Sequence, residues 1–147
     1  LDPPELIQEG LRLSGQAPAP LPPRKTSGKV LIVEDSVTSR ALLRRTLENA
    51  GFQVTTASDG MEAFSILLEE EVDIVVSDVD MPRMNGFSLT EKIRNDERLS
   101  HLPVVLVTAL DSREDREHGL SSGANAYILK GTFERSELVR TVKGLLA

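Results

Sequence analysis

Between residues 29 and 147 the sequence alternates short apolar runs with longer segments in which apolar residues follow helical spacing. The run Ile74-Val75-Val76 is β-branched and lacks the polar alternation of a strand that faces water on one side. Buried strands separated by helices are typical of a parallel sheet covered on both faces. We therefore predict an α/β fold, with strands at 30–33, 54–57, 74–78, 104–107 and 126–129 and helices at 36–50, 61–70, 87–95, 112–123 and 133–146.

Several expected helices carry recognisable end signals. Gly51 is placed to cap the C-terminus of the helix at 36–50, and Asp59 with Glu62 forms an acidic variant of the capping box. Gly119 is expected to interrupt the polar helix at 112–123, because glycine weakens a helix interior. The first helix is expected to pack through the apolar residues at helical spacing, which are Val37, Ala41, Leu43, Leu47 and Ala50.

The N-terminal part differs in composition, since six of the eight prolines precede residue 24. We expect a short helical remnant of an upstream domain at 1–14, a Pro-rich, semi-rigid linker at 15–28 and one globular domain at 29–147. A disordered tail is the alternative for the linker. Because the chain begins with Leu1 rather than Met, we expect it to be a fragment of a longer protein.

Composition excludes several classes of function. The formal net charge of −6 argues against nucleic acid or an anionic membrane surface as a partner. The absence of cysteine excludes disulfides, thiolate chemistry and cysteine metal sites. No apolar run approaches the ~18 residues of a transmembrane helix and no leader opens the chain, so we expect a cytoplasmic protein.

Polar groups follow four of the five expected strands: Glu34-Asp35, Asp78, Thr108 and Lys130. The carboxyl ends of parallel strands share one edge of a sheet, which is where open α/β folds bind their ligands. The second strand ends in Ala57-Ser58 and contributes nothing obvious. Carboxylates that share an edge repel one another, and one lysine offsets only part of their charge. A divalent cation, Mg²⁺ or Mn²⁺, would offset the rest, held by Asp35, Asp78 and a backbone carbonyl near Asp80, with Glu34 alongside.

This set of groups suits phosphoryl transfer to a carboxylate. Such a transfer needs an in-line nucleophile and neutralisation of the equatorial oxygens. We expect Asp78 to be the nucleophile, Lys130 to pair with one phosphoryl oxygen and Thr108 to donate a hydrogen bond to another. The small Ala109 would leave the approach open. Each residue alone is more often a cap, a packing residue or a solvated charge, so the argument depends on the joint pattern.

Together these residues resemble the CheY-like receiver domain of two-component response regulators, over 29–147. The matching positions are Glu34-Asp35, Asp78, Asp80-Met81-Pro82, Gly86, Thr108-Ala109, Tyr127 and Lys130. The resemblance implies a flavodoxin-like (βα)5 three-layer sandwich, whose five-stranded parallel sheet has the order 2-1-3-4-5 with helices on both faces. It also implies that Asp78 takes a phosphoryl group from a kinase phosphohistidine, with Mg²⁺, and later loses it by hydrolysis. The domain would thus assist its own phosphorylation and dephosphorylation, whether or not it is classed as an enzyme.

The resemblance further implies a conformational switch. Thr108 would move toward the phosphoryl group, Tyr127 would turn inward, and the surface formed by 112–123, 126–129 and 133–146 would change its partners. Moving such an equilibrium from mostly inactive to mostly active takes roughly 3–5 kcal/mol. The side chains of Asp80 and Leu110, which flank the site, would tune hydrolysis by controlling the attacking water.

One position departs from the family. Lys130 is followed by Gly131 where the family usually has a cis proline, so we expect a different loop there. Lys-Gly-Thr-Phe at 130–133 resembles receivers fused to the C-terminus of CheA-like chemotaxis histidine kinases, and 1–7 resembles the end of the CheW-like domain of those kinases. The parent would then be a hybrid kinase, with its own phosphotransfer domain as the phosphate donor and a chemotaxis adaptor or downstream regulator as a further partner.

Three alternatives compete with this assignment. A haloacid-dehalogenase-type phosphatase also has an Asp-x-Asp after an apolar strand, but in that family this strand comes first, whereas here Glu34-Asp35 precedes Asp78. A flavodoxin would need amide and hydroxyl donors in the first loop, which is acidic here. The stronger alternative is a receiver fold that binds partners without being phosphorylated.

Overall fold

The computed structural model describes residues 28–130 and 135–147. The expected segments at 1–14 and 15–28, the loop at Gly131 and the start of the last helix at Phe133 lie outside the described residues, apart from Gly28. The strands are β2 (Lys29–Val33), β3 (Gln53–Ala57), β4 (Ile74–Ser77), β5 (Val104–Thr108) and β6 (Ala126–Leu129). They form one parallel sheet in the order β3-β2-β4-β5-β6, which confirms the expected order 2-1-3-4-5.

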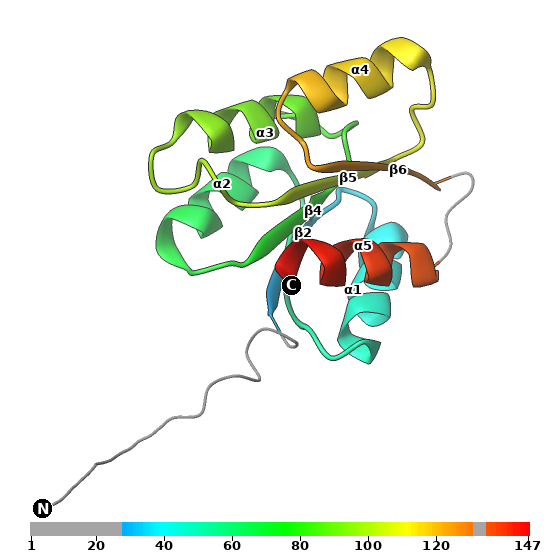
Figure 1. Ribbon diagram of the computed structural model, residues 1–147. Helices are drawn as coiled ribbons and strands as arrows, with labels where there is room; N and C mark the ends of the chain where they lie inside the picture. Colours follow the sequence, from blue (N-terminus) through cyan, green and yellow to red (C-terminus); the bar gives the residue numbers. More distant parts are fainter. Residues whose placement is uncertain (1–27, 131–134) are drawn as a thin grey trace, which may run out of the picture.

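Helices cover both faces of this sheet, as the ribbon shows (Figure 1). One face carries α2, α3 and α4, and the other carries α1 and α5. Their bounds are α1 (Val37–Asn49), α2 (Gly60–Glu69), α3 (Gly86–Asn95), α4 (Arg113–Ser121) and α5 (Arg135–Leu146). No helix in the described part of the chain is both long and apolar enough to cross a membrane.

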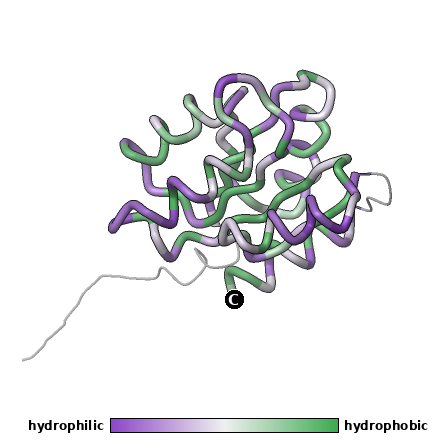
Figure 2. The backbone as a smooth tube through the Cα atoms, turned by 90° about the horizontal axis from the view of Figure 1, so that it is seen from above, coloured by the Kyte–Doolittle hydropathy of each residue, from purple (hydrophilic) through white to green (hydrophobic). Residues whose placement is uncertain are grey.

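The sheet separates two hydrophobic cores, and successive strand residues alternate between them. Leu31 and Val33 pack with α2 and α3, whereas Val30 and Ile32 pack with α1 and α5. All four side chains are fully buried, which explains the unbroken apolar runs. Seen from above, hydrophobic residues follow the central strands and hydrophilic residues gather on the outer turns (Figure 2).

Helix α1 has the expected ends but not the whole expected apolar face. The hydroxyl of Ser36 accepts a hydrogen bond from the amide of Ser39, and Gly51, at φ 100°, ends the helix. The expected packing of Val37 and Ala41 is wrong, since both side chains are exposed, that of Val37 to 71%. At 3.6 residues per turn Val37 lies about 100° around the helix from the stripe of Leu43 and Leu47, which are the buried leucines of α1.

Helix α4 continues through Gly119, so the expected interruption is wrong. Gly119 is buried, and a Cβ there would lie 3.2 Å from Cδ1 of Tyr127 and 3.4 Å from Cδ1 of Leu106. The missing side chain therefore lets the tyrosine ring pack against the helix. This packing offsets the cost of a glycine in the helix interior.

Candidate functional site

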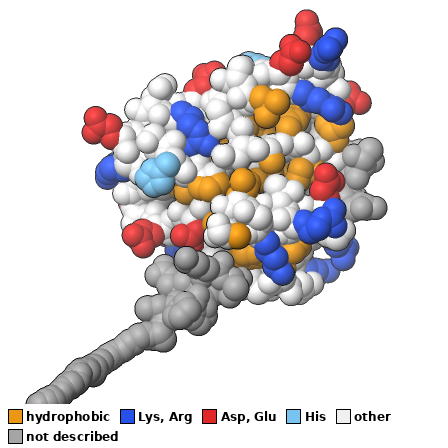
Figure 3. All heavy atoms as spheres, viewed as in Figure 1, with side chains coloured by type: hydrophobic (Ala, Val, Ile, Leu, Met, Phe, Trp, Pro, Cys, Tyr) orange, Lys and Arg blue, Asp and Glu red, His pale blue; other side chains and the backbone are white. Residues whose placement is uncertain are grey.

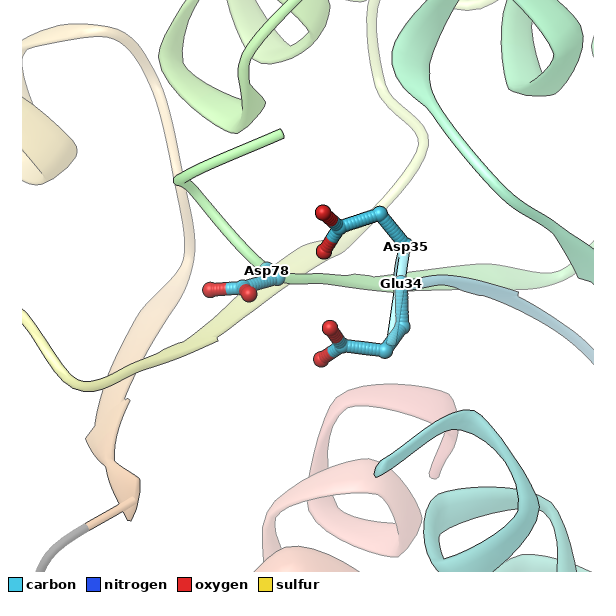
Figure 4. Close-up of side chains that lie close together, drawn as sticks. All are labelled: Glu34, Asp35 and Asp78. Atoms are coloured by element: carbon cyan, nitrogen blue, oxygen red, sulfur yellow. The ribbon is translucent and has the colours of Figure 1, made fainter. Parts of the chain in front are cut away.

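Three carboxylates meet at the carboxyl edge of the sheet. Glu34 and Asp35 follow β2, Asp78 follows β4, and these strands are paired so that the amide of Asp78 donates to the carbonyl of Val33 at 2.9 Å. One oxygen from each carboxylate lies within 4.8 Å of the others. The close-up shows the three side chains gathered at this edge (Figure 4).

Burial makes this cluster electrostatically costly. Glu34 is 1% exposed and Asp78 is 7% exposed, whereas Asp35 faces solvent. Desolvation raises the pKa of Glu34, and the charge of Asp78 raises it further, although the hydrogen bond from Lys130 acts in the opposite direction. Keeping Glu34 ionised in this partly dry site therefore costs free energy.

Lys130 supplies the cation that the sequence predicted. Its Nζ donates to Oε1 of Glu34 at 2.7 Å and to Oδ2 of Asp78 at 3.2 Å. Burial would lower the pKa of Lys130, but the hydrogen bond to Glu34 and the charges of Asp78 and Glu34 outweigh it, so the pKa is raised. One ammonium group faces three carboxylates, which leaves net negative charge. This all-oxygen donor set fits a hard divalent cation such as Mg²⁺.

The loop after Asp78 packs closely against the end of β4. Oδ1 of Asp78 accepts from the amide of Val79 at 2.7 Å, and the amide of Gly86 donates to the carbonyl of Val79 at 2.9 Å. A Cβ on Gly86 would lie 2.3 Å from the carbonyl oxygen of Asp78, so only glycine fits there. Asp80 is exposed, and no donor within the described residues occupies its carbonyl oxygen, which leaves that oxygen available as a ligand.

Thr108 and Tyr127 are brought together through the backbone of Leu110. Oγ1 of Thr108 accepts from the amide of Leu110 at 3.2 Å, and the hydroxyl of Tyr127 donates to the carbonyl of Leu110 at 2.8 Å. Thr108 is buried, and its hydroxyl makes no hydrogen bond with Asp78 among the contacts of the described residues. Ala109 is exposed beside it. Burial, followed by the charge of Asp115, raises the pKa of Tyr127.

The end of β3 contributes more than the sequence indicated. Asp59, two residues past Ala57, is 4% exposed. It caps α2 as expected, because Oδ1 accepts from the amide of Glu62 at 2.9 Å. Its Oδ2 accepts from Nε of Arg83 at 3.0 Å and also from Nη2. The backbone bond from Glu62, followed by the bond from Arg83, lowers the pKa of Asp59. The sequence predicted the cap that Asp59 provides. It could not predict the pairing of Asp59 with Arg83, because the two residues are 24 positions apart in the chain.

Three carboxylates, a lysine and a threonine thus lie at the carboxyl edge of one parallel sheet. This arrangement defines a receiver-type domain. The family model of the response regulator receiver domain matches residues 30–143, and the chain belongs to this family. It is therefore a receiver domain of two-component signalling.

Relatives of several kinds resemble it. The chemotaxis protein CheY-3 of Vibrio cholerae is 42% identical over 103 residues, which cover 69% of this chain and 79% of that protein. A gliding motility regulatory protein of Myxococcus xanthus is 31% identical over 142 residues, which cover 97% of this chain and 18% of that protein. The chain also spans 46% and 23% of the lengths of two other curated relatives, a probable transcriptional regulator of Guillardia theta and the response regulator PleD of Caulobacter vibrioides.

Solved receiver domains share the fold. The signal receiver domain of a histidine kinase from Syntrophus aciditrophicus has a TM-score of 0.77 at 36% identity, covering 82% of this chain and 90% of that one. The receiver domain of the sensor histidine kinase PA1611 from Pseudomonas aeruginosa was solved with a magnesium ion in its active-site cleft. It has a TM-score of 0.76 at 30% identity, covering 82% of this chain and 98% of that one.

Proposed function

We propose that this receiver domain is a phosphoacceptor, with Asp78 as the residue that takes the phosphoryl group from a kinase phosphohistidine. The observation that carries the proposal is the convergence of Glu34, Asp35 and Lys130 on Asp78 at one sheet edge. A buried carboxylate surrounded by like charge and one ammonium has little use in stabilising the fold. The four side chains together provide the nucleophile and the charged groups that transfer of a phosphoryl group requires.

In the transfer, a carboxylate oxygen of Asp78 forms a bond to phosphorus while the bond from phosphorus to the kinase histidine breaks and its electron pair returns to the imidazole. Lys130, already 3.2 Å from Oδ2 of Asp78, would neutralise one phosphoryl oxygen. Asp35, Asp78 and the carbonyl of Asp80, with Glu34 alongside, would hold Mg²⁺ or Mn²⁺. When bound, the cation supplies charge neutralisation of the phosphoryl oxygens.

The structural effect of phosphorylation would then pass to the surface through the backbone of Leu110. If Thr108 turns its hydroxyl to a phosphoryl oxygen, it releases the amide of Leu110, whose carbonyl holds the hydroxyl of Tyr127. The ring of Tyr127 lies against Gly119 of α4, so its movement would alter the face formed by α4, β6 and α5. Ala109 would keep the approach open, and the side chains of Asp80 and Leu110 would tune hydrolysis.

The test is Mg²⁺-dependent labelling of the chain by acetyl phosphate, with beryllofluoride binding followed by NMR. We expect stoichiometric modification of the wild type and none of Asp78→Asn. Asp111→Asn, an exposed acid in the loop before α4, is the matched control and should behave as the wild type. A wild type that responds no more than Asp78→Asn would contradict the phosphoacceptor role and favour a pure interaction module.

We further propose that the domain belongs to a CheA-like hybrid histidine kinase, with 1–14 from a preceding CheW-like domain and 15–28 as the linker. The match to the Myxococcus protein supports this, because covering 97% of the chain requires it to extend into residues 1–28. A stretch similar to the start of this chain therefore precedes the region matched by residues 29–147 in a much longer protein. The similarity to two receiver domains of histidine kinases points the same way.

The context has its own test, which uses a phosphorylated CheA-like phosphotransfer domain as donor. We expect its phosphohistidine to discharge at least about tenfold faster to this receiver than to unrelated receivers, since cognate surfaces favour the encounter. Equal rates would contradict the hybrid-kinase context while leaving Asp78 as an acceptor.

A further inference from the structure

The loop that follows the acceptor is fastened to the N-terminus of α2 at two points. Arg83 pairs with the buried carboxylate of Asp59, and the amide of Gly60 donates to the carbonyl of Met84 at 3.3 Å. The loop lies so close that a Cβ on Gly60 would be 2.7 Å from that carbonyl oxygen. Both contacts join segments that are more than 20 residues apart in the chain.

Arg83 adopts a backbone conformation that side chains seldom take. Its φ is 68°, and it is the one positive-φ residue other than glycine in the described ranges. This left-handed conformation costs an L-residue free energy, and it persists where surrounding contacts hold it. Here the guanidinium group donates through both Nε and Nη2 to one oxygen of Asp59.

The two oxygens of Asp59 have different partners. Oδ1 caps α2, while Oδ2 faces Arg83. The side chain of Asp59 is 5% exposed and that of Arg83 is 64% exposed, so the carboxylate is the protected half of the pair. Both hydrogen bonds of the pair are charge-assisted, which makes them stronger than bonds between neutral groups.

The held loop is continuous with the acceptor. It runs from Val79, whose amide donates to Asp78, to Gly86, whose amide donates back to the carbonyl of Val79. Asp80, the proposed carbonyl ligand, lies between these two points, three residues before Arg83. Restraining Arg83 therefore limits the positions available to that carbonyl.

We infer that Asp59 and Arg83 form a clamp that positions the acceptor loop, and with it the carbonyl of Asp80, for the divalent cation. Both are positioning residues, since neither touches the acceptor. The metal part of this inference rests on the proposed function, whereas the restraint on the loop does not. If the clamp acts in this way, the N-terminus of α2 influences the affinity for the metal ion, although the sequence predicted no site residue in that helix.

The experiment compares Asp59→Asn, Arg83→Asn and the double variant in the full 147-residue chain. Asparagine at 59 keeps an oxygen to cap α2, and asparagine at 83 tolerates a positive φ, so each change removes the ion pair with little other damage. Arg44→Gln, which breaks the exposed Arg44–Glu48 pair of α1, is the control. Amide exchange of Gly86 in metal-free protein and the Kd for Mg²⁺ from loop amide shifts are the readouts.

We expect each single variant to raise exchange of Gly86 and to weaken Mg²⁺ binding roughly tenfold, as loss of a group supporting a metal ligand does. The double variant should be no worse than either single one, because the pair acts as a unit. The amide of Phe52, bonded to Leu47 in another part of the fold, should be unchanged.

Unchanged Gly86 exchange in Asp59→Asn would overturn the clamp, as would strictly additive effects in the double variant or equal acceleration at Phe52. A wild type that binds no Mg²⁺ would overturn the proposed function instead. In that case the exchange data alone would still support the clamp or reject it.

Discussion

Gly86, the first residue of α3, packs directly against the backbone of Asp78 and Val79. We expect Gly86→Ala to destabilise the protein by roughly 1–3 kcal/mol, since a Cβ at 2.3 Å from the carbonyl of Asp78 must displace backbone. Gly144→Ala is the matched control, because Gly144 is also helical but has nothing within 4 Å of an added Cβ. That variant should be neutral or more stable by up to about 1 kcal/mol. Urea unfolding measures both, and equal effects would contradict the close approach.

The loss of folding stability at acid pH should depend in part on Asp59. Its pKa is lowered from an ordinary value of 3.8, so the ionised form stabilises the fold above that value and the benefit is lost as pH falls through the lower folded value. We therefore expect the stability advantage of the wild type over Asp59→Asn to shrink from about pH 6 to about pH 3. Glu34 has a raised pKa and acts in the opposite sense, so only the difference between the two proteins is informative. An advantage that does not change with pH would contradict the ionised pair.

Among the elements, α4 is the one whose packing depends on a missing side chain. Gly119→Ala should favour the helix by about 1 kcal/mol through propensity, yet press on the ring of Tyr127. We expect the ring to shift and its hydrogen bond to Leu110 to weaken. Tyr127 is the sole tyrosine and the chain has no tryptophan, so near-ultraviolet circular dichroism reports this ring with little interference. Gly144→Ala again serves as the control, and an unchanged tyrosine signal in Gly119→Ala would refute the contact.

The elements themselves were largely predictable. The strands and the order of the sheet follow from apolar runs and from the family resemblance, and the meeting of Glu34, Asp35, Asp78 and Lys130 follows from strands that end at one edge. What the sequence did not disclose depends on contacts between distant segments. The ring that fills the space beside Gly119 is one case. The pairing of Asp59 with Arg83 is another, since it requires the left-handed backbone of the loop.

For the molecule as a whole, excess negative charge at one edge should link stability to divalent cations. At a Mg²⁺ concentration ten times its Kd, the native state gains about 1.4 kcal/mol, which raises the unfolding temperature by several degrees. We expect Asp35→Asn to lose most of this gain, since Asp35 is the exposed member of the cluster and its removal disturbs little packing. Calorimetric scans with Mg²⁺ and with a chelator make the measurement.

The matched control for this prediction is Glu69→Gln, an exposed acid at the C-terminal end of α2. It should keep the full Mg²⁺ response. A wild type whose unfolding temperature does not move with Mg²⁺, or an Asp35→Asn protein that responds fully, would show that the cluster does not bind the cation.

Charge elsewhere on the molecule is less organised than at this edge. On the face seen in Figure 3, acidic and basic side chains lie interspersed around exposed hydrophobic ones. Long-range electrostatics therefore give no single direction of approach on that face, and we expect partner choice there to depend on local fit rather than on net charge.

The alternation of β4 between two cores restricts how the length of this strand, and with it the position of Asp78, can vary. Val75 belongs to the core beneath α2 and α3, while Ile74 and Val76 belong to the core beneath α1 and α5. Inserting one residue in β4 would turn every later side chain of the strand, and Asp78 after it, to the opposite face of the sheet. Inserting two residues would restore the original faces. The direction in which Asp78 points thus depends on whether the number of residues added to β4 is odd or even. Odd changes in the length of β4 should be forbidden even where even ones are tolerated.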